Sequence, residues 1–300
     1  MSKKLRIAFL HKALLFGGAE RLILDMALAF KEQSHEVSIY TAEYDKEKTF
    51  TDFQTSGVEI RKVCSFLPPR IKGKFHALMN YVRMLFITLY FVFSFRKFDL
   101  VVVDQITLPI PILRLFRKKV LYYCHFPEAL LNDNKRTFIV IIYRFVVDLI
   151  ESFCLYFATL ICFNSQYTQT NVEQTFKAIK KWKGKKYVVY PCMQNPAMIL
   201  PKIPNAEDFP KDGFLLSLNR FETRKRIDIA VEAFAKAISK SDKVKKSGLK
   251  LVLAGGLDKK NQDALNCREA LGKQAEQLGI KDRVVFRENI SQEEKEVLLT

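Results

Sequence analysis

The sequence lacks the patterns that mark a metal site, a disulfide framework or a secreted chain. Its six cysteines are scattered, with no Cys-x-x-Cys pair and no His near two of them at metal-ligand spacing. Four of the six lie in or beside apolar runs, so we expect buried thiols in a reducing compartment. The first apolar run, Ile7–Leu10, is too short for a signal peptide and precedes no small-residue cleavage site.

Long uninterrupted apolar runs are also missing. Ala77–Phe95 carries Asn80 and Arg83, which leaves only Met84–Phe95 free of strongly polar groups. Phe138–Phe163 is longer, but charged residues at spacings of four and three place a polar stripe on an otherwise apolar helix. These residues are Arg144, Asp148 and Glu151. For both segments two interpretations stay open: deep packing in the core, or contact with a membrane interface.

Two familiar nucleotide-binding signatures are absent after the first apolar run. Gly17-Gly18-Ala19-Glu20-Arg21 is neither the Gly-x-Gly-x-x-Gly fingerprint nor a Walker loop. The missing fingerprint argues against a nicotinamide-dependent oxidoreductase. No DNA- or RNA-binding motif occurs, and the basic residues are spread over both halves, so nucleic acid is not an expected partner.

What is present is an excess of positive charge on a globular composition. The 300 residues include 49 Lys and Arg against 32 Asp and Glu, a net charge of +17, and 49% of the residues are hydrophobic. The length predicts about two domains. The charge predicts anionic partners such as phosphorylated substrates or a lipid surface.

Short apolar segments alternate with helical patterns along the chain, which predicts an α/β fold with parallel sheets covered on both faces. Five of the ten prolines lie between Pro191 and Pro210, where neither a helix nor a central strand is sustained. We therefore predict domains at 1–190 and 213–300 with a linker at 191–212. The predicted strands are Leu5–His11, Val37–Thr41, Val58–Val63, Leu100–Asp104, Val120–Cys124, Leu160–Asn164, Phe214–Leu218, Leu249–Ala254 and Val284–Phe286.

The second domain is expected to be incomplete. Ser291-Gln292-Glu293-Glu294 fits a capping box that starts a helix, and the sequence stops at Thr300 with only three strands predicted in this domain. We expect the chain to be the N-terminal part of a longer protein or the product of a truncated reading of its gene.

Several candidate site residues follow predicted strands, where ligands of doubly wound folds bind. Arg220 and Lys225 follow Phe214–Leu218 and directly precede a helix, an arrangement that suits a diphosphate. A solvated basic turn is the alternative. Gly17-Gly18 and Gly255-Gly256 let a backbone approach a phosphate, although simple turns also explain them.

Polar residues end three strands of the first domain. His125 follows Val120–Cys124 and either donates to a sugar hydroxyl or shares a proton, or it is an ordinary loop histidine; His11 ranks second as a candidate. Asp104-Gln105 either binds a hydroxyl-rich substrate or caps a turn. The lysines around the only Trp, in Lys177–Lys186, form a solvated helix end, a nucleic-acid patch or a membrane anchor, of which the first is favoured.

Taken together, six motifs resemble the retaining GT-B glycosyltransferases of family 4. Within that family they are most similar to the mannosyltransferases that extend the dolichol-linked oligosaccharide on the cytosolic face of the endoplasmic reticulum membrane. The resemblance runs from about Arg6 to Thr300. The motifs are Gly-Gly-Ala-Glu-Arg, Val-Asp-Gln, Tyr-Cys-His-Phe-Pro, Phe-Asn-Ser-Gln-Tyr-Thr, Asn-Arg-Phe-Glu and Leu-Ala-Gly-Gly.

The resemblance implies two Rossmann-like domains facing a cleft, and it implies roles for particular residues. Arg220 and Lys225 would hold the diphosphate of GDP-mannose and stabilise the leaving group, so that no metal or other cofactor is needed. His125 would contact the transferred mannose. The donor set would also include Gly17, Gly18, Gly255 and Gly256. The acceptor set would be Asp104, Gln105, Phe126 and Glu128, although the related enzymes carry Asp where this chain has Glu128.

The implied acceptor is a dolichol-diphosphate-linked oligosaccharide, extended from Man1GlcNAc2 by α-1,3 and then α-1,6 transfer. The implied partners are the endoplasmic reticulum membrane surface and other early-pathway mannosyltransferases. Family members carry a Glu-x7-Glu motif in the second domain that these 300 residues do not include. The alternative interpretation is therefore a non-catalytic, membrane-associated fragment that binds a lipid diphosphate or a nucleotide.

Overall fold

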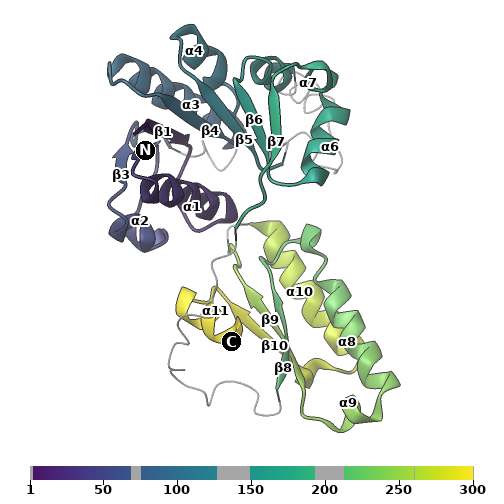
Figure 1. Cartoon of the computed structure of the whole chain (residues 1–300). Coiled ribbons are helices and arrows are strands. Elements are labelled where there is room, and N and C mark those ends of the chain that lie inside the picture. Colours follow the sequence, from purple (N-terminus) through teal and green to yellow (C-terminus); the bar gives the residue numbers. More distant parts are fainter. Residues whose placement is uncertain (1–2, 69–75, 127–148, 193–212, 260, 300) are drawn as a thin grey trace. The chain divides into compact units, whose positions relative to one another are not determined.

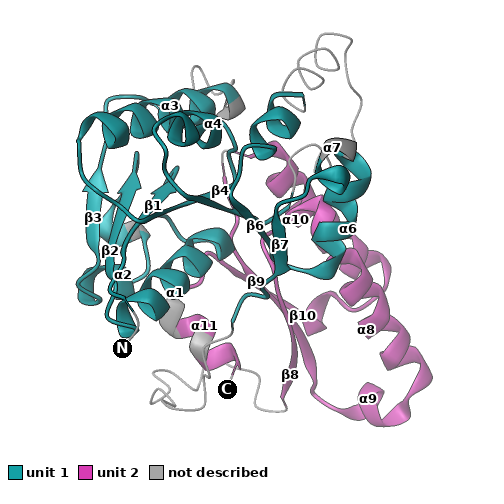
Figure 2. Ribbon diagram, turned by 45° about the horizontal axis from the view of Figure 1, so that its top comes forward, with its two compact units in different colours: residues 1–193 teal, residues 194–300 magenta. Residues whose placement is uncertain are grey.

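The computed structural model describes residues 3–68, 76–126, 149–192, 213–259 and 261–299. The chain divides into two compact units, unit 1 with residues 1–193 and unit 2 with residues 194–300 (Figures 1 and 2). Most of the predicted linker, 193–212, lies outside the described residues.

Unit 1 is built on one sheet of parallel strands in the order β3-β2-β1-β4-β5-β6-β7. Six of the strands were expected from their apolar runs, and β7 was not. The strands are β1 Arg6–His11, β2 Glu36–Thr41, β3 Glu59–Lys62, β4 Leu100–Asp104, β5 Val120–Cys124, β6 Leu160–Phe163 and β7 Lys185–Val188. The predicted parallel α/β architecture is confirmed.

The central strands read as continuous apolar runs because both faces of the sheet are covered. In β1, Ile7 and Phe9 pack into one core together with α1, while Ala8 and Leu10 pack into a second core with α3 and α4. Figure 1 shows these helices on opposite faces of the sheet. Successive side chains of a strand point to opposite faces, so a strand buried on both has no polar alternation.

The helices of unit 1 follow the expected apolar periodicity. In α1 the apolar face of the helix buries Leu22, Ile23 and Ala27. The remaining helical segments are short connections or cover the second face. The elements are α1 Gly18–Glu32, η1 Lys46–Lys48, α2 Asp52–Thr55, α3 His76–Phe93, α4 Pro109–Leu115, α6 Gln166–Thr175 and α7 Lys177–Lys181, with a further helix at 149–155.

The two interrupted apolar segments take different forms. Helix α3 buries Met84, Ile87 and Phe91 in the core, while its other face leaves large side chains exposed. In the second segment, residues 138–148 lie outside the described residues, and the helix ends at 155 before β6 begins. The interpretation of Phe138–Phe163 as one helix is therefore wrong. Among the described helices, none is long and apolar enough to cross a bilayer.

The lysine-rich segment around the only Trp is a short helix followed by an edge strand. Trp182 packs partly against the core, and its indole Nε1 donates to the carbonyl of Tyr156 at 3.0 Å. Strand β7 follows as the edge strand of the sheet and begins with an exposed Lys185. Charged side chains on an edge strand discourage pairing with another chain.

Unit 2 has a smaller parallel sheet in the order β10-β9-β8. Helices α8 and α10 cover one face and α11 lies on the other (Figure 1). The predicted capping residue is confirmed, since Ser291 Oγ accepts from Glu294 N–H at 3.1 Å. The elements are β8 Phe214–Leu218, η5 Thr223–Lys225, α8 Asp228–Lys240, α9 Asp242–Lys246, β9 Lys250–Gly255, α10 Gln262–Gln277, η6 Lys281–Arg283, β10 Val284–Glu288 and α11 Gln292–Leu299.

The strand order of unit 1 reverses direction between β1 and β4. From β1 the chain builds outward through β2 and β3, and then returns to add β4 to β7 on the other side. In open parallel sheets the crevice at such a switch point, beyond the carboxyl ends of the strands, is where ligands bind. His11 ends β1, Asp104 ends β4 and His125 follows β5, so three polar residues meet at this edge.

Candidate functional site

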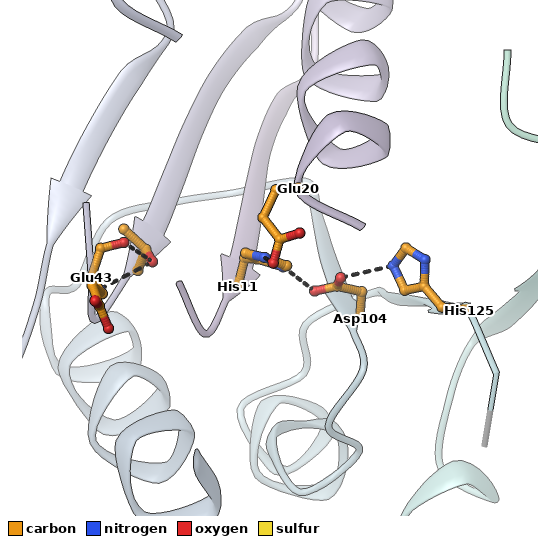
Figure 3. A network of polar contacts seen from close by, with 6 residues as sticks. His11, Glu20, Glu43, Asp104 and His125 are labelled. Atoms are coloured by element: carbon orange, nitrogen blue, oxygen red, sulfur yellow. Dashed lines mark hydrogen bonds and ion pairs between the residues drawn. The ribbon is translucent and has the colours of Figure 1, made fainter. Parts of the chain in front are cut away.

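One buried carboxylate joins two imidazoles at the switch point. Asp104 Oδ1 lies 2.7 Å from His11 Nδ1, and Asp104 Oδ2 lies 2.9 Å from His125 Nε2 (Figure 3). The side chains of His11 and Asp104 have no exposed surface, whereas that of His125 is 20% exposed. The parallel register produces this cluster, because β4 lies between β1 and β5 with Leu10 beside Val103 and Asp104 beside Tyr123.

The charges of this cluster support one another. Burial by itself would lower the pKa of His11, but the charge of Asp104, its hydrogen bond to the ring and the nearby Glu20 carboxylate raise it to about 9. Burial would likewise raise the pKa of Asp104, but the charge of His11 and hydrogen bonds from both imidazoles hold it well below its usual range. At neutral pH the buried pair is therefore a protonated His11 and an ionised Asp104.

Glu20 approaches His11 from the start of α1. Its Oε1 lies 3.5 Å from His11 Nε2, a distance that gives a charge interaction rather than a good hydrogen bond. Burial opposes ionisation, but the interaction with His11 lowers the pKa of Glu20. Gly17, the N-cap of α1, leaves room for this carboxylate, since a Cβ at Gly17 would lie 2.1 Å from Glu20 Oε2.

The next residue along β4, Gln105, has a left-handed backbone with φ of 58°. Its Oε1 is buried and has no hydrogen-bond partner among the described residues. A left-handed backbone at a non-glycine residue costs about 1–3 kcal/mol and often marks a functional site.

The other predicted acceptor residues are Phe126 and Glu128. Phe126 stacks on Tyr167 with ring centroids 6.2 Å apart. Glu128, the last predicted acceptor residue, lies outside the described residues.

In unit 2 the predicted diphosphate loop is anchored by apolar residues and exposes its cations. Phe221 and Ile227 are buried in the core beneath α8 and α10. Between these anchors lie Arg220, whose side chain is 64% exposed and pairs with Glu222 at 3.3 Å, and Lys225. Within the described residues, no ion pair or hydrogen bond engages the ammonium of Lys225. Both cations follow the carboxyl end of β8, as the sequence predicted.

Gly255 and Gly256 lie directly against this loop. A Cβ at Gly255, where φ is 143°, would lie 2.1 Å from the carbonyl oxygen of Asn219, while one at Gly256 would lie 3.6 Å from Arg220 Cγ. Backbone bonds join the segments: Asn219 N–H donates to Ala254 O at 2.9 Å, and Phe221 N–H donates to Gly256 O at 3.0 Å. The glycine pair therefore sets the position of the Arg220 backbone.

Sequence reasoning gave no role to two residues that the structure brings to these loops. Glu20 was part of the Gly-Gly motif without a function of its own. Asn289 holds the β9 loop, because its Oδ1 accepts from Leu257 N–H at 2.8 Å and its Nδ2 donates to Leu257 O at 3.1 Å. The local sequence does not predict either the Glu20–His11 contact or the Asn289–Leu257 contact. Asn289, for example, is 32 residues from Leu257 in the sequence.

Three further features bear on other possible sites: a hollow in unit 1, the absence of a metal-binding group among the described residues, and the state of the cysteines. A hollow of about 460 Å³ opens at the amino edge of the sheet, lined by eleven residues that include Arg6, Glu59 and Arg96. In the described part of the chain, no group of three or more His, Cys, Asp or Glu side chains is arranged to hold a metal ion. All six cysteines are free; Cys124, Cys154 and Cys162 are buried, and Cys192 is exposed.

Two successive parallel α/β units with loops of this kind define the GT-B fold of glycosyltransferases. Solved structures share it: a sucrose-phosphate synthase from Thermosynechococcus elongatus matches 98% of this chain and 73% of its own at a TM-score of 0.62 and 18% identity. The trehalose-6-phosphate synthase OtsA matches 98% and 75% at a TM-score of 0.66 and 9% identity. At such identities the likeness concerns the fold alone.

The chain belongs to glycosyltransferase family 4. The model described as "Glycosyltransferase Family 4" matches residues 16–192, and the one described as "Glycosyl transferases group 1" matches residues 201–300. The chain is similar to proteins named alpha-1,3/1,6-mannosyltransferase ALG2. The protein from Candida glabrata is 35% identical over 86% of this chain, and the human protein is 34% identical over 98%.

The match covers only part of these relatives. The chain spans 55% of the length of the Candida glabrata protein and 71% of the human one. The relative from Dictyostelium discoideum is 32% identical over 99% of this chain, which spans 74% of it. The family is thus established for the chain, while the activity of the whole protein is a matter for proposal.

Proposed function

We propose that the chain carries the sugar-transfer machinery of a retaining mannosyltransferase that takes mannose from GDP-mannose. The acceptor is a dolichol-diphosphate-linked oligosaccharide, which the enzyme extends by α-1,3 and then α-1,6 linkage in N-glycan precursor assembly. The observation that carries the proposal is the His11–Asp104–His125 cluster at the switch point, in a chain 31–35% identical to several alpha-1,3/1,6-mannosyltransferases. The resemblance to asparagine-linked glycosylation protein 2 supplies the acceptor.

The roles of particular residues are part of the proposal. Exposed cations on an anchored loop support Arg220 and Lys225 as ligands of the donor diphosphate, where they stabilise charge on the leaving group without a metal or other cofactor. The partly exposed imidazole supports His125 as a contact of the transferred mannose. Gly255 and Gly256 hold the backbone of Arg220 in place.

Contact with the cytosolic face of the endoplasmic reticulum membrane is supported by the exposed face of α3. Phe86, Tyr90 and Phe93 lie along this face, each between 43% and 59% exposed, and Phe66 packs edge-on against Phe86 with ring centroids 6.1 Å apart. Aromatic side chains favour the membrane–water interface, and a net charge of +17 favours anionic lipid. A lipid-linked acceptor would be met at such a surface.

The test combines a transfer assay with liposome flotation. The chain is incubated with radiolabelled GDP-mannose and a short-chain Man1GlcNAc2-diphospholipid, and the lipid fraction is counted and digested with α-mannosidase. We expect label to enter the lipid as α-linked mannose from GDP-mannose and not from UDP-glucose. Flotation with anionic liposomes in the absence of any transfer would support the non-catalytic fragment instead.

A further inference from the structure

Asp104 has both of its carboxylate oxygens committed to different imidazoles. Oδ1 faces His11 Nδ1 at 2.7 Å and Oδ2 faces His125 Nε2 at 2.9 Å, with no exposed surface on the carboxylate (Figure 3). An ionised carboxylate only accepts hydrogen bonds. Both rings must therefore present an N–H to it, which places a proton on His11 Nδ1 and a proton on His125 Nε2. A buried carboxylate in this position is not placed to contact an acceptor directly.

His11 and Glu20 hold that carboxylate in its ionised form. The titratable groups in contact with His11 are Asp104 from β4 and Glu20 from α1, and the second contact of Asp104 is His125 after β5. When His11 is protonated, its imidazolium lies between two carboxylates, Asp104 and Glu20, and both negative charges stabilise it. This arrangement lowers the pKa of Asp104 and leaves His125 facing a permanent anion.

Among the described residues, no hydrogen bond engages the second ring nitrogen of His125. Nε2 is bound to Asp104, and Figure 3 shows the other nitrogen, Nδ1, directed away from it. A neutral imidazole that carries its proton on Nε2 has an unprotonated Nδ1, which accepts a hydrogen bond. The backbone of His125 is also held, because Thr168 Oγ1 donates to its carbonyl at 3.5 Å.

We propose that Asp104, supported by His11 and Glu20, is a positioning residue that locks His125 with its proton on Nε2, so that Nδ1 accepts a hydrogen bond from a hydroxyl of the bound sugar. The identity of that sugar rests on the proposed function. The orientation of the ring does not, because it follows from contacts within unit 1. Asp104 thus acts through His125, in place of the direct acceptor contact that the sequence suggested.

The test is nitrogen NMR of the chain with ¹⁵N-labelled histidine rings, of which there are only four. We expect the neutral His125 ring to be the tautomer with its proton on Nε2, the nitrogen that faces Asp104, and His11 to carry protons on both nitrogens at neutral pH. His35, which contacts neither Asp104 nor Glu20, serves as the internal reference. A His125 ring with its proton on Nδ1, or one that averages between both forms, would overturn the inference.

Asp104→Asn provides the decisive variant. An amide accepts through its oxygen but donates through its nitrogen, so it serves only one of the two rings as an acceptor. At least one ring must then turn an unprotonated nitrogen toward residue 104, and that change is visible in the spectrum. If both rings keep the states they have in the unaltered chain, the carboxylate does not set them and the inference fails.

Glu20→Gln keeps the inference testable should Asp104→Asn not fold. The change keeps the shape of a side chain that lies at the helix start and is 14% exposed. We expect the titration of His11 to fall from about 9 toward 6.5; no change would contradict the support role.

Turnover supplies an independent readout. With Asp104→Asn, kcat for mannosyl transfer should fall on the order of ten-fold or more while KM for GDP-mannose stays within about two-fold, and His35→Gln should change neither. An unchanged kcat overturns the positioning role. A chain with the expected ring states that transfers no mannose contradicts the proposed function and leaves the ring inference standing.

Discussion

A Cβ atom on Gly17 would lie 2.1 Å from Glu20 Oε2, whereas one on Gly18 would have nothing within 4 Å. Adjacent glycines in one motif thus have different requirements. Gly17 makes room for the carboxylate that faces His11, and its backbone is extended with φ of −173°, so the requirement is space and not conformation. Gly18 has no such neighbour within unit 1, and the space beside it is open to a ligand.

Gly17→Ala should therefore push the Glu20 carboxylate away from His11. Because this contact is one of those that raise the pKa of His11, the titration of His11 should move down toward 6.5. Gly18→Ala is the matched control: it should leave the titration in place and stabilise α1 by up to about 1 kcal/mol. Histidine NMR and thermal unfolding measure the two effects; equal titration shifts in both variants would contradict the assignment.

The stability of unit 1 should depend on pH through His11. The folded state holds this proton with a pKa of about 9, compared with 6.5 for an ordinary histidine, so the contribution is complete below pH 6.5 and is lost as pH rises through 9. For a residue with no exposed surface the loss is on the order of 3 kcal/mol. Trp182, the only Trp, reports unfolding of unit 1 by fluorescence.

We expect the free energy of unfolding of unit 1 to fall steadily between pH 6.5 and 9. His11→Gln should flatten this slope, and His35→Gln should leave it intact. A slope that survives His11→Gln would show that another group is responsible.

Gly255→Ala should damage unit 2 far more than Gly256→Ala. At Gly255 the φ of 143° is one that L side chains rarely adopt, and the new methyl would collide with the Asn219 carbonyl; at Gly256 it would make an ordinary contact at 3.6 Å. We expect a loss of roughly 2–4 kcal/mol for Gly255→Ala and less than about 1 kcal/mol for Gly256→Ala. Urea unfolding measures both, and similar losses would contradict the close approach of these loops.

Much of the fold follows from the sequence, because its strands are buried on both faces and leave an unmistakable apolar run. That holds for β1, β4 and β5 in unit 1 and for β9 in unit 2. Strand β7 was not predicted because it begins with two adjacent lysines, Lys185 and Lys186, and this short edge strand has no strong apolar pattern. The prediction of one helix over Phe138–Phe163 is wrong at its C-terminal end, because the residues from Leu160 onward form a strand that pairs with β5.

The sequence predicted which residues stand at the ends of the strands and so belong to the candidate site. It did not predict which of these residues contact one another. Parallel strands bring their carboxyl ends to one edge, so His11, Asp104 and His125 were all candidates there. Their pairing depends on register across separations of 21 and 93 residues, for which a single sequence carries no signal. The sequence left Asp104 either as a contact of a hydroxyl-rich substrate or as the cap of a turn, and it gave no sign that this carboxylate is buried between two imidazoles.

The central claim is tested most directly by mannosyl transfer from GDP-mannose with the double variant Arg220→Ala, Lys225→Ala. Arg224→Ala is the matched control, because Arg224 is an exposed cation on the same short helix as Lys225 and pairs with Glu222, as Arg220 does. If Arg220 and Lys225 bind the donor diphosphate as proposed, removing both should reduce kcat/KM by at least about a thousand-fold, while the control should stay within about three-fold. Transfer by the double variant at the rate of the control would contradict the account.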